Sequence, residues 1–180
     1  MLMSAARSAL LVVDVQQRLL PAVVAPQVVV KNTAVLIRAA QRLGVPIIAS
    51  EQYPRGIGST VPELAQLLSP DQVLEKLHFS CIGDLGFAAR LREQARPQAV
   101  VAGIEAHVCV LQTVEDLVAQ GTDTFVVEDA TSSRTERNHA AAMARMRAAG
   151  AHVVTTEMVV FEWMEIAGTP EFKELSTLIK

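Results

Sequence analysis

The chain has 180 residues, of which 51% are hydrophobic and 19% are charged, and its formal net charge is −3. This composition is typical of a globular domain with a sizeable core and excludes a disordered chain. Lysine and arginine are scattered, and the apolar runs are too short to cross a bilayer, so we expect neither a nucleic-acid partner nor a membrane partner.

Short β-branched runs alternate with longer helical patterns along the chain. The pattern predicts strands at 9–13, 46–49, 73–74, 99–102, 124–127 and 152–155. It predicts helices at about 26–43, 62–68, 85–95, 110–120, 135–149 and 157–180, the last broken near Gly168 and Pro170. Residues 52–58 are rich in glycine and proline and are expected to form a loop. The prediction is a single α/β domain over residues 1–180, with a six-stranded parallel sheet and helices on both faces.

Only two cysteines occur, Cys81 and Cys109, and residues 1–7 lack the order of charge, apolar region and cleavage site of a signal peptide. Reduced thiols and a cytoplasmic location are therefore expected, with a mitochondrial or other internal address left open. The low share of charged residues indicates buried contacts between subunits, so we expect a homo-oligomer, a dimer or larger.

Chemically useful side chains stand where the predicted strands end, which is where ligands bind in this fold class. They are Asp14, Glu51 to Tyr53, Lys76, Cys109 and Asp129. Cys109 follows a strand and a tight turn at the start of a helix, where unpaired N–H groups and a partial positive charge lower a thiol pKa. We predict that Cys109 is a nucleophile, that Asp14 accepts its proton and that Lys76 stabilises both anions.

Five segments carry a family resemblance: residues 11–16 (LVVDVQ), 51–54 (EQYP), 76–80 (KLHFS), 103–110 (GIEAHVCV) and 129–134 (DATSSR). Together they resemble the isochorismatase-like cysteine hydrolases, and most of all the isochorismatase domain-containing proteins, over essentially the whole chain. The resemblance implies a three-layer, Rossmann-like fold and a triad of Asp14, Lys76 and Cys109. It also implies a cis peptide bond between Ile104 and Glu105, which would turn the Glu105 N–H beside that of Cys109 to form an oxyanion hole.

The chain departs from the nicotinamidase branch of this family, which carries an Asp-x-His pair and a further histidine as a zinc site. Glu51, Gln52 and Tyr53 stand at that place, and none of the four histidines has that spacing. We therefore predict no metal, no other cofactor and no nicotinamidase activity. True isochorismatases hydrolyse a vinyl ether without needing this cysteine. Cys109 thus points to a small amide-like or other carbonyl substrate and a thioester-type intermediate.

Several residues could form the wall of the substrate pocket: Gln16, Glu51, Gln52, Tyr53, Phe79 and His107. Each could instead serve packing or a subunit contact. Taken alone, Cys109 could be a small buried residue, Asp14 a cap and Lys76 a surface cation. Arg134 with Asp129 is expected to be a structural ion pair, and Cys81 is expected to serve packing.

Two other functions stay open. The same thiol could be the redox-responsive group of a non-enzymatic, oligomeric interaction protein. The fold could also be a scaffold that binds a metabolite without converting it.

Overall fold

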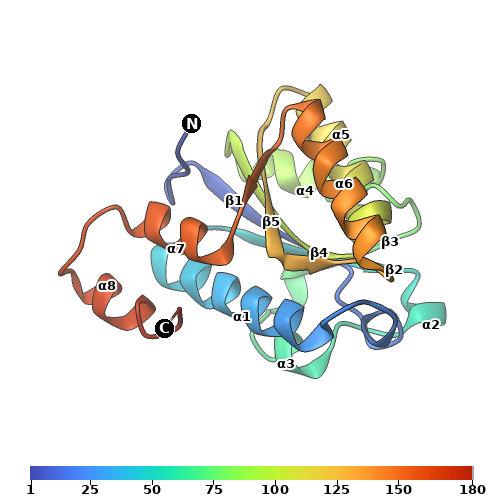
Figure 1. The fold of residues 1–180 in the computed structure, drawn as a ribbon, viewed down its shortest axis with the longest axis horizontal. Coiled ribbons are helices and arrows are strands. Elements are labelled where there is room, and N and C mark those ends of the chain that lie inside the picture. Colours follow the sequence, from blue (N-terminus) through green and yellow to red (C-terminus); the bar gives the residue numbers. More distant parts are fainter. Residues whose placement is uncertain (180) are drawn as a thin grey trace.

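A computed structural model describes residues 1–179, in which six parallel strands form one sheet in the order β3-β2-β1-β4-β5-β6. The strands are β1 (Ser8–Val13), β2 (Ile47–Gln52), β3 (Val73–Lys76), β4 (Gln98–Ile104), β5 (Asp123–Ser132) and β6 (His152–Val154). Helices α1, α7 and α8 cover one face of the sheet, and α4, α5 and α6 cover the other (Figure 1). The predicted α/β fold with a six-stranded parallel sheet is confirmed.

The helices are α1 (Pro26–Leu43), α2 (Pro54–Ile57), α3 (Pro62–Ala65), α4 (Leu85–Glu93), α5 (Leu111–Ala119), α6 (Glu136–Ala149), α7 (Thr156–Met164) and α8 (Pro170–Leu175). Helix α1 has the predicted bounds, because proline starts it and Gly44 ends it with a φ of 69°. The short α2 stands where a loop was predicted, and α3 ends three residues earlier than predicted. Within residues 1–179, no helix is both long and apolar enough to span a bilayer.

Strand β5 is longer than predicted and runs on to Ser132. Asp129 therefore lies within the strand, and the prediction that it stands at the strand end is wrong. Its Oδ1 accepts hydrogen bonds from the N–H of Thr156 at 2.7 Å and from the hydroxyl of the same residue at 2.9 Å. Asp129 thus holds the start of α7.

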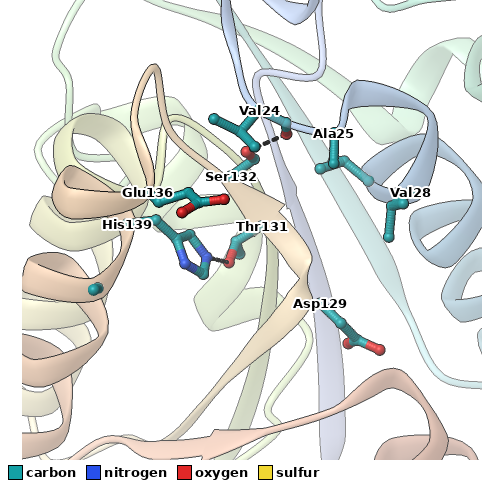
Figure 2. A pocket seen from close by; sticks show the side chains of 10 residues that line it. Val24, Ala25, Val28, Asp129, Thr131, Ser132, Glu136 and His139 are labelled. Carbon is teal, nitrogen blue, oxygen red and sulfur yellow. Dashed lines mark hydrogen bonds between the residues drawn. The ribbon is translucent and has the colours of Figure 1, made fainter.

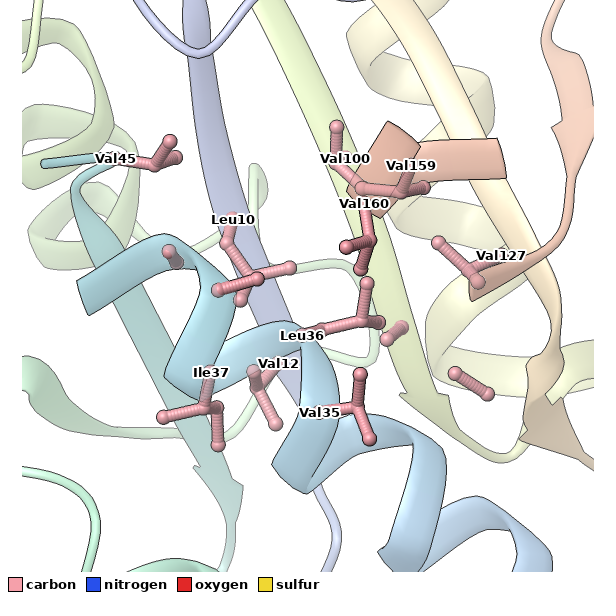
Figure 3. Close-up of a cluster of buried hydrophobic side chains, with 14 of the residues drawn as sticks. Leu10, Val12, Val35, Leu36, Ile37, Val45, Val100, Val127, Val159 and Val160 are labelled. Atoms are coloured by element: carbon pink, nitrogen blue, oxygen red, sulfur yellow. The ribbon is translucent and has the colours of Figure 1, made fainter. Parts of the chain in front are cut away.

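The core has two parts, one on each face of the sheet. On the α1 face, Leu10 and Val12 of β1 pack with Leu36 of α1 (Figure 3). On the other face, Leu11 and Val13 belong to the cluster that also contains both cysteines. Successive residues of β1 are thus buried on opposite faces, which explains why the strand reads as an unbroken apolar run.

Among the side chains that the structure describes, one buried polar atom is left without a hydrogen-bond partner. It is Oγ1 of Thr33 in α1, a residue with no exposed surface. Thr33→Val keeps the shape and removes this hydroxyl, so we expect it to raise the free energy of unfolding by about 1 kcal/mol.

Thr113→Val is the matched control for that measurement. The Thr113 hydroxyl accepts a hydrogen bond from the N–H of Cys81 at 3.0 Å and donates one to the carbonyl of Cys109 at 2.7 Å. The same exchange should therefore destabilise the protein at this position. Urea unfolding of both variants checks the pair, and destabilisation by Thr33→Val would contradict the expectation.

Candidate active site

The carboxyl ends of β1 and β4 lie side by side, and a glycine allows the two strands to come close there. Gly103 pairs with Val13, and a Cβ on Gly103 would lie 2.0 Å from the Val13 carbonyl oxygen. Asp14 follows β1 directly, with a φ of 51°. Cys109 follows β4 in a π-helical turn, Ala106–Val110, that leads into α5. The chain leaves β1 and β4 towards opposite faces of the sheet, so this is its topological switch point.

Asp14 and Lys76 form an ion pair in which neither side chain has exposed surface, with Nζ and Oδ2 2.8 Å apart. Lys76 is the last residue of β3, and β2 lies between β3 and β1. The other carboxylate oxygen of Asp14, Oδ1, accepts a hydrogen bond from the hydroxyl of Ser50 in β2 at 2.7 Å. Each carboxylate oxygen of Asp14 therefore accepts one strong hydrogen bond.

The ammonium group of Lys76 has three further acceptors: Gln52 Oε1 at 2.7 Å, and the carbonyl oxygens of Phe79 and His78 at 3.1 and 3.2 Å. Burial by itself lowers the pKa of Lys76. The negative charge of Asp14 and the hydrogen bond to it oppose this effect, and the pKa of Lys76 is raised overall. Lys76 is therefore a buried ammonium group with four acceptors, and the reading of it as a solvated surface cation is wrong.

Cys109 is 5% exposed and belongs to the same buried cluster as Cys81. Burial first, and the negative charge of Asp14 second, raise the pKa of the Cys109 thiol, and Lys76 opposes them only in part. The expectation that the pKa of Cys109 is lowered is wrong, because burial and the Asp14 carboxylate raise it. At rest Cys109 is a neutral thiol beside a carboxylate.

The second cysteine, Cys81, is linked to Asp14 through the hydroxyl of Ser50. The Cys81 thiol donates to the hydroxyl oxygen of Ser50 over 3.5 Å, and burial, followed by the charge of Asp14, raises the pKa of Cys81 to about 11. It too is a neutral thiol, fully buried.

The peptide bond between Ile104 and Glu105 is cis. In residues 1–179 the N–H of Glu105 donates no hydrogen bond. The Glu105 carboxylate, 7% exposed, pairs with Arg134 through contacts of 2.7 and 3.1 Å. The expected ion pair of Arg134 with Asp129 is therefore wrong. Arg134 pairs with Glu105, and Asp129 accepts hydrogen bonds from Thr156.

The side chains of three of the six candidate pocket residues are fixed by hydrogen bonds to neighbouring residues. The Gln16 amide donates to the carbonyls of Gln52 and Gly58 and accepts from the N–H of Gln52. Glu51 accepts two hydrogen bonds from Thr60, and Gln52 bridges Lys76 and the carbonyl of Leu77.

The other three candidates are more open. His107 contacts the hydroxyl of Ser133 through Nδ1 at 2.9 Å, while Tyr53 and Phe79 are about half exposed. Tyr53 and Lys76 help to line a cavity of about 320 Å³, although the ammonium group of Lys76 faces Asp14.

A second cavity, of about 360 Å³, opens at the far end of β5 between the first turns of α1 and α6 (Figure 2). Val24 and Val28 form an apolar wall, and His139 faces them, with Nε2 3.1 Å from the Thr131 hydroxyl. No predicted site residue lines this cavity apart from Asp129, which was expected at a strand end. Among the described residues, no group of three or more His, Cys, Asp or Glu side chains could hold a metal ion.

The sequence interpretation missed Ser50, which donates a hydrogen bond to Asp14, and Thr113, which links the N–H of Cys81 to the carbonyl of Cys109. A serine that directly follows Ile47-Ile48-Ala49 is a buried polar residue near a strand end, and this was the available signal. Thr113 had no such signal, because its position in α5 is also that of an ordinary helix residue.

Comparison with known proteins gives one family. The family model of the isochorismatase domain matches residues 8–158. Isochorismatase domain-containing protein 2 of Danio rerio is 37% identical over 96% of this chain and 86% of its own length.

Among solved structures, the MAR1 ribonuclease from Caenorhabditis elegans has a TM-score of 0.92 and 34% identity, covering 99% of this chain and 92% of its own. The YcaC gene product of Escherichia coli, described as an octameric hydrolase of unknown specificity, has a TM-score of 0.93, 26% identity and coverages of 99% and 89%. YcaC from Pseudomonas aeruginosa, solved with covalent acrylamide, has a TM-score of 0.90, 25% identity and coverages of 99% and 95%. With its six-stranded parallel sheet and these similarities, the chain belongs to the isochorismatase family.

Proposed function

We propose that this chain acts as one metal-independent cysteine hydrolase domain whose substrate is a small amide-like or other carbonyl compound. The observation that carries the proposal is the buried Asp14–Lys76 ion pair beside the buried thiol of Cys109. Ion pairs without exposed surface are expensive to desolvate, so their place at the switch point of the sheet favours a chemical role over a purely structural one.

The first step moves a proton within the cluster. Cys109 gives its proton to Asp14 as its sulfur forms a bond to the carbonyl carbon of the substrate. Lys76 stays charged throughout, so the summed charge of the three side chains before attack is the same whether the proton is on sulfur or on Asp14. The raised pKa of the Cys109 thiol describes loss of the proton to water, which is a harder process than this local transfer.

The remaining steps return each group to its starting state. The carbon–nitrogen bond of an amide substrate breaks, and the leaving amine takes the proton held by Asp14. A water then gives a proton to Asp14 and attacks the thioester carbon, and the carbon–sulfur bond breaks as that proton returns to Cys109. The N–H groups of Glu105 and Cys109 hold the oxyanion in both halves, and the absence of an acceptor for the Glu105 N–H within residues 1–179 supports this role.

The test is to trap the nucleophile with acrylamide, the amide-bearing electrophile found covalently bound in the similar Pseudomonas protein. We expect one adduct by intact mass, on the peptide that contains Cys109 and not on the one that contains Cys81. An adduct on Cys81 alone, or no adduct at any pH, would sink the proposal.

Hydrolysis of RNA is the rival reaction that the name of the Caenorhabditis protein raises. Phosphodiester chemistry uses exposed cations on the phosphate. Here Lys76 is buried and its ammonium group already contacts Asp14 and Gln52, and the chain carries a net charge of −3. A carbonyl substrate fits this site better, and a short RNA added to the amide and ester panel checks the choice.

We also propose that the protein is a homo-oligomer, which is supported by the octameric state described for the Escherichia coli protein. Four large apolar side chains near the site are at least half exposed: Tyr53, Leu77, Phe79 and Leu85. A sedimentation experiment at micromolar concentration should show more than one subunit.

A further inference from the structure

We propose that Ser50 is a positioning residue that orients the Asp14 carboxylate to accept the proton of Cys109. This inference rests on the proposed function, in which Asp14 is the base. Ser50 is 1% exposed, and its hydroxyl lies 2.7 Å from Asp14 Oδ1.

The direction of the hydrogen bonds is fixed by counting hydrogens. A carboxylate only accepts, so the single hydrogen of the Ser50 hydroxyl points to Asp14. The Ser50 oxygen is then free to accept, and the neutral thiol of Cys81 donates to it over 3.5 Å. The chain of donors therefore runs from Cys81 to Ser50 to Asp14.

Orientation is what the second hydrogen bond adds. Lys76 alone holds only Oδ2, and a carboxyl group held at one oxygen still rotates about its Cβ–Cγ bond, whose torsional preference is broad. With Ser50 on Oδ1 and Lys76 on Oδ2, both oxygens are fixed and the plane of the carboxylate is set. The lone pairs that remain on Asp14 then face a constant direction.

Ser50 also suits a group that changes its protonation state. Lys76 can only donate, whereas a hydroxyl can donate to the carboxylate and can turn to accept from a carboxylic acid. Its place is secured by the sheet, because Ser50 pairs with Val13 in the register of β1 and β2 and its carbonyl accepts the N–H of Asp14 at 3.1 Å. The backbone carbonyl and the side-chain hydroxyl of Ser50 thus both form hydrogen bonds with Asp14.

The experiment measures the rate constant for acrylamide labelling of Cys109 in a double-mutant cycle of Ser50→Ala and Asp14→Asn. We expect Ser50→Ala to slow labelling about tenfold or more, the factor that loss of one hydrogen bond to a charged group brings. In the Asp14→Asn background, the same change should have little further effect, because the base is already absent. Ser50→Thr, which keeps the hydroxyl, should label faster than its isosteric partner Ser50→Val. This second pair also answers the question if Ser50→Ala does not fold.

The possible results separate the two proposals. Labelling by wild type that Asp14→Asn does not slow would overturn the proposed function and this inference with it. Slow labelling in Asp14→Asn, together with normal labelling in Ser50→Ala, would overturn only the role of Ser50. The role of Ser50 would also be overturned if Ser50→Ala slowed labelling as much in the Asp14→Asn background as in the wild type. The substitution would then act through the packing of β2.

Discussion

Turnover of any substrate identified for this protein should fall by roughly 10³-fold or more when Cys109 is replaced by alanine, because the proposed reaction then has no nucleophile. The fold should survive the change. Cys109 is a small buried side chain in the π-helical turn that leads into α5, and alanine removes only its sulfur atom. The free energy of unfolding should change by about 1 kcal/mol. Steady-state kinetics and urea unfolding on the same preparation measure the two quantities.

A conservative buried substitution away from the site controls for general effects of mutation. Thr33→Val lies on α1, on the other face of the sheet, and should keep full turnover. Full turnover in Cys109→Ala would contradict the cysteine mechanism. A wild-type protein that hydrolyses nothing in an amide and ester panel, yet oxidises at Cys109 with peroxide, would favour the redox-responsive function instead.

Local sequence patterns predicted most of the fold because residues at the ends of the longest elements mark where those elements begin and end. Helix α1 has proline at its first position and glycine after its last, and β1 is an apolar run ended by Asp14. The miss at β5 has a physical cause. The strand shifts its register against β4 between Val101 and Gly103, and it continues through polar residues that show no alternation.

The geometry of the candidate site was harder to predict from local sequence patterns, because its residues come from different strands. Lys76 ends an edge strand of only four residues that the sequence defines poorly, so the placement of this strand leaned on the family resemblance. The pKa of Cys109 was predicted in the wrong direction because a sequence displays a helix start but not the depth of burial around it. Ser50 meets Asp14 only through the register of β1 and β2, which no pattern within either strand reveals.

The second large effect is expected at Lys76. Lys76→Met should lower the free energy of unfolding by about 3–5 kcal/mol, because it leaves the Asp14 carboxylate buried without its counter-charge. The change should also abolish acrylamide labelling and turnover, since Lys76 would no longer hold the Asp14 carboxylate that acts as the base. Lys31→Met is the matched control, since Lys31 is an exposed lysine of α1 and its loss should change stability by no more than about 0.5 kcal/mol.

The double variant Asp14→Asn/Lys76→Met separates the ion pair from simple loss of packing. It removes both charges together, so it should be less destabilised than Lys76→Met alone.

The pH dependence of the free energy of unfolding tests the ion pair independently. Since the pKa of Lys76 is raised in the folded state, its stabilising effect is fully present below the usual lysine value of 10.5 and is lost as the pH rises through the higher folded value. At neutral pH the wild type should therefore keep the full contribution of Lys76 to its stability and lose it only in strong alkali. Loss of this contribution near neutrality would mean that Lys76 is not charged in the folded protein.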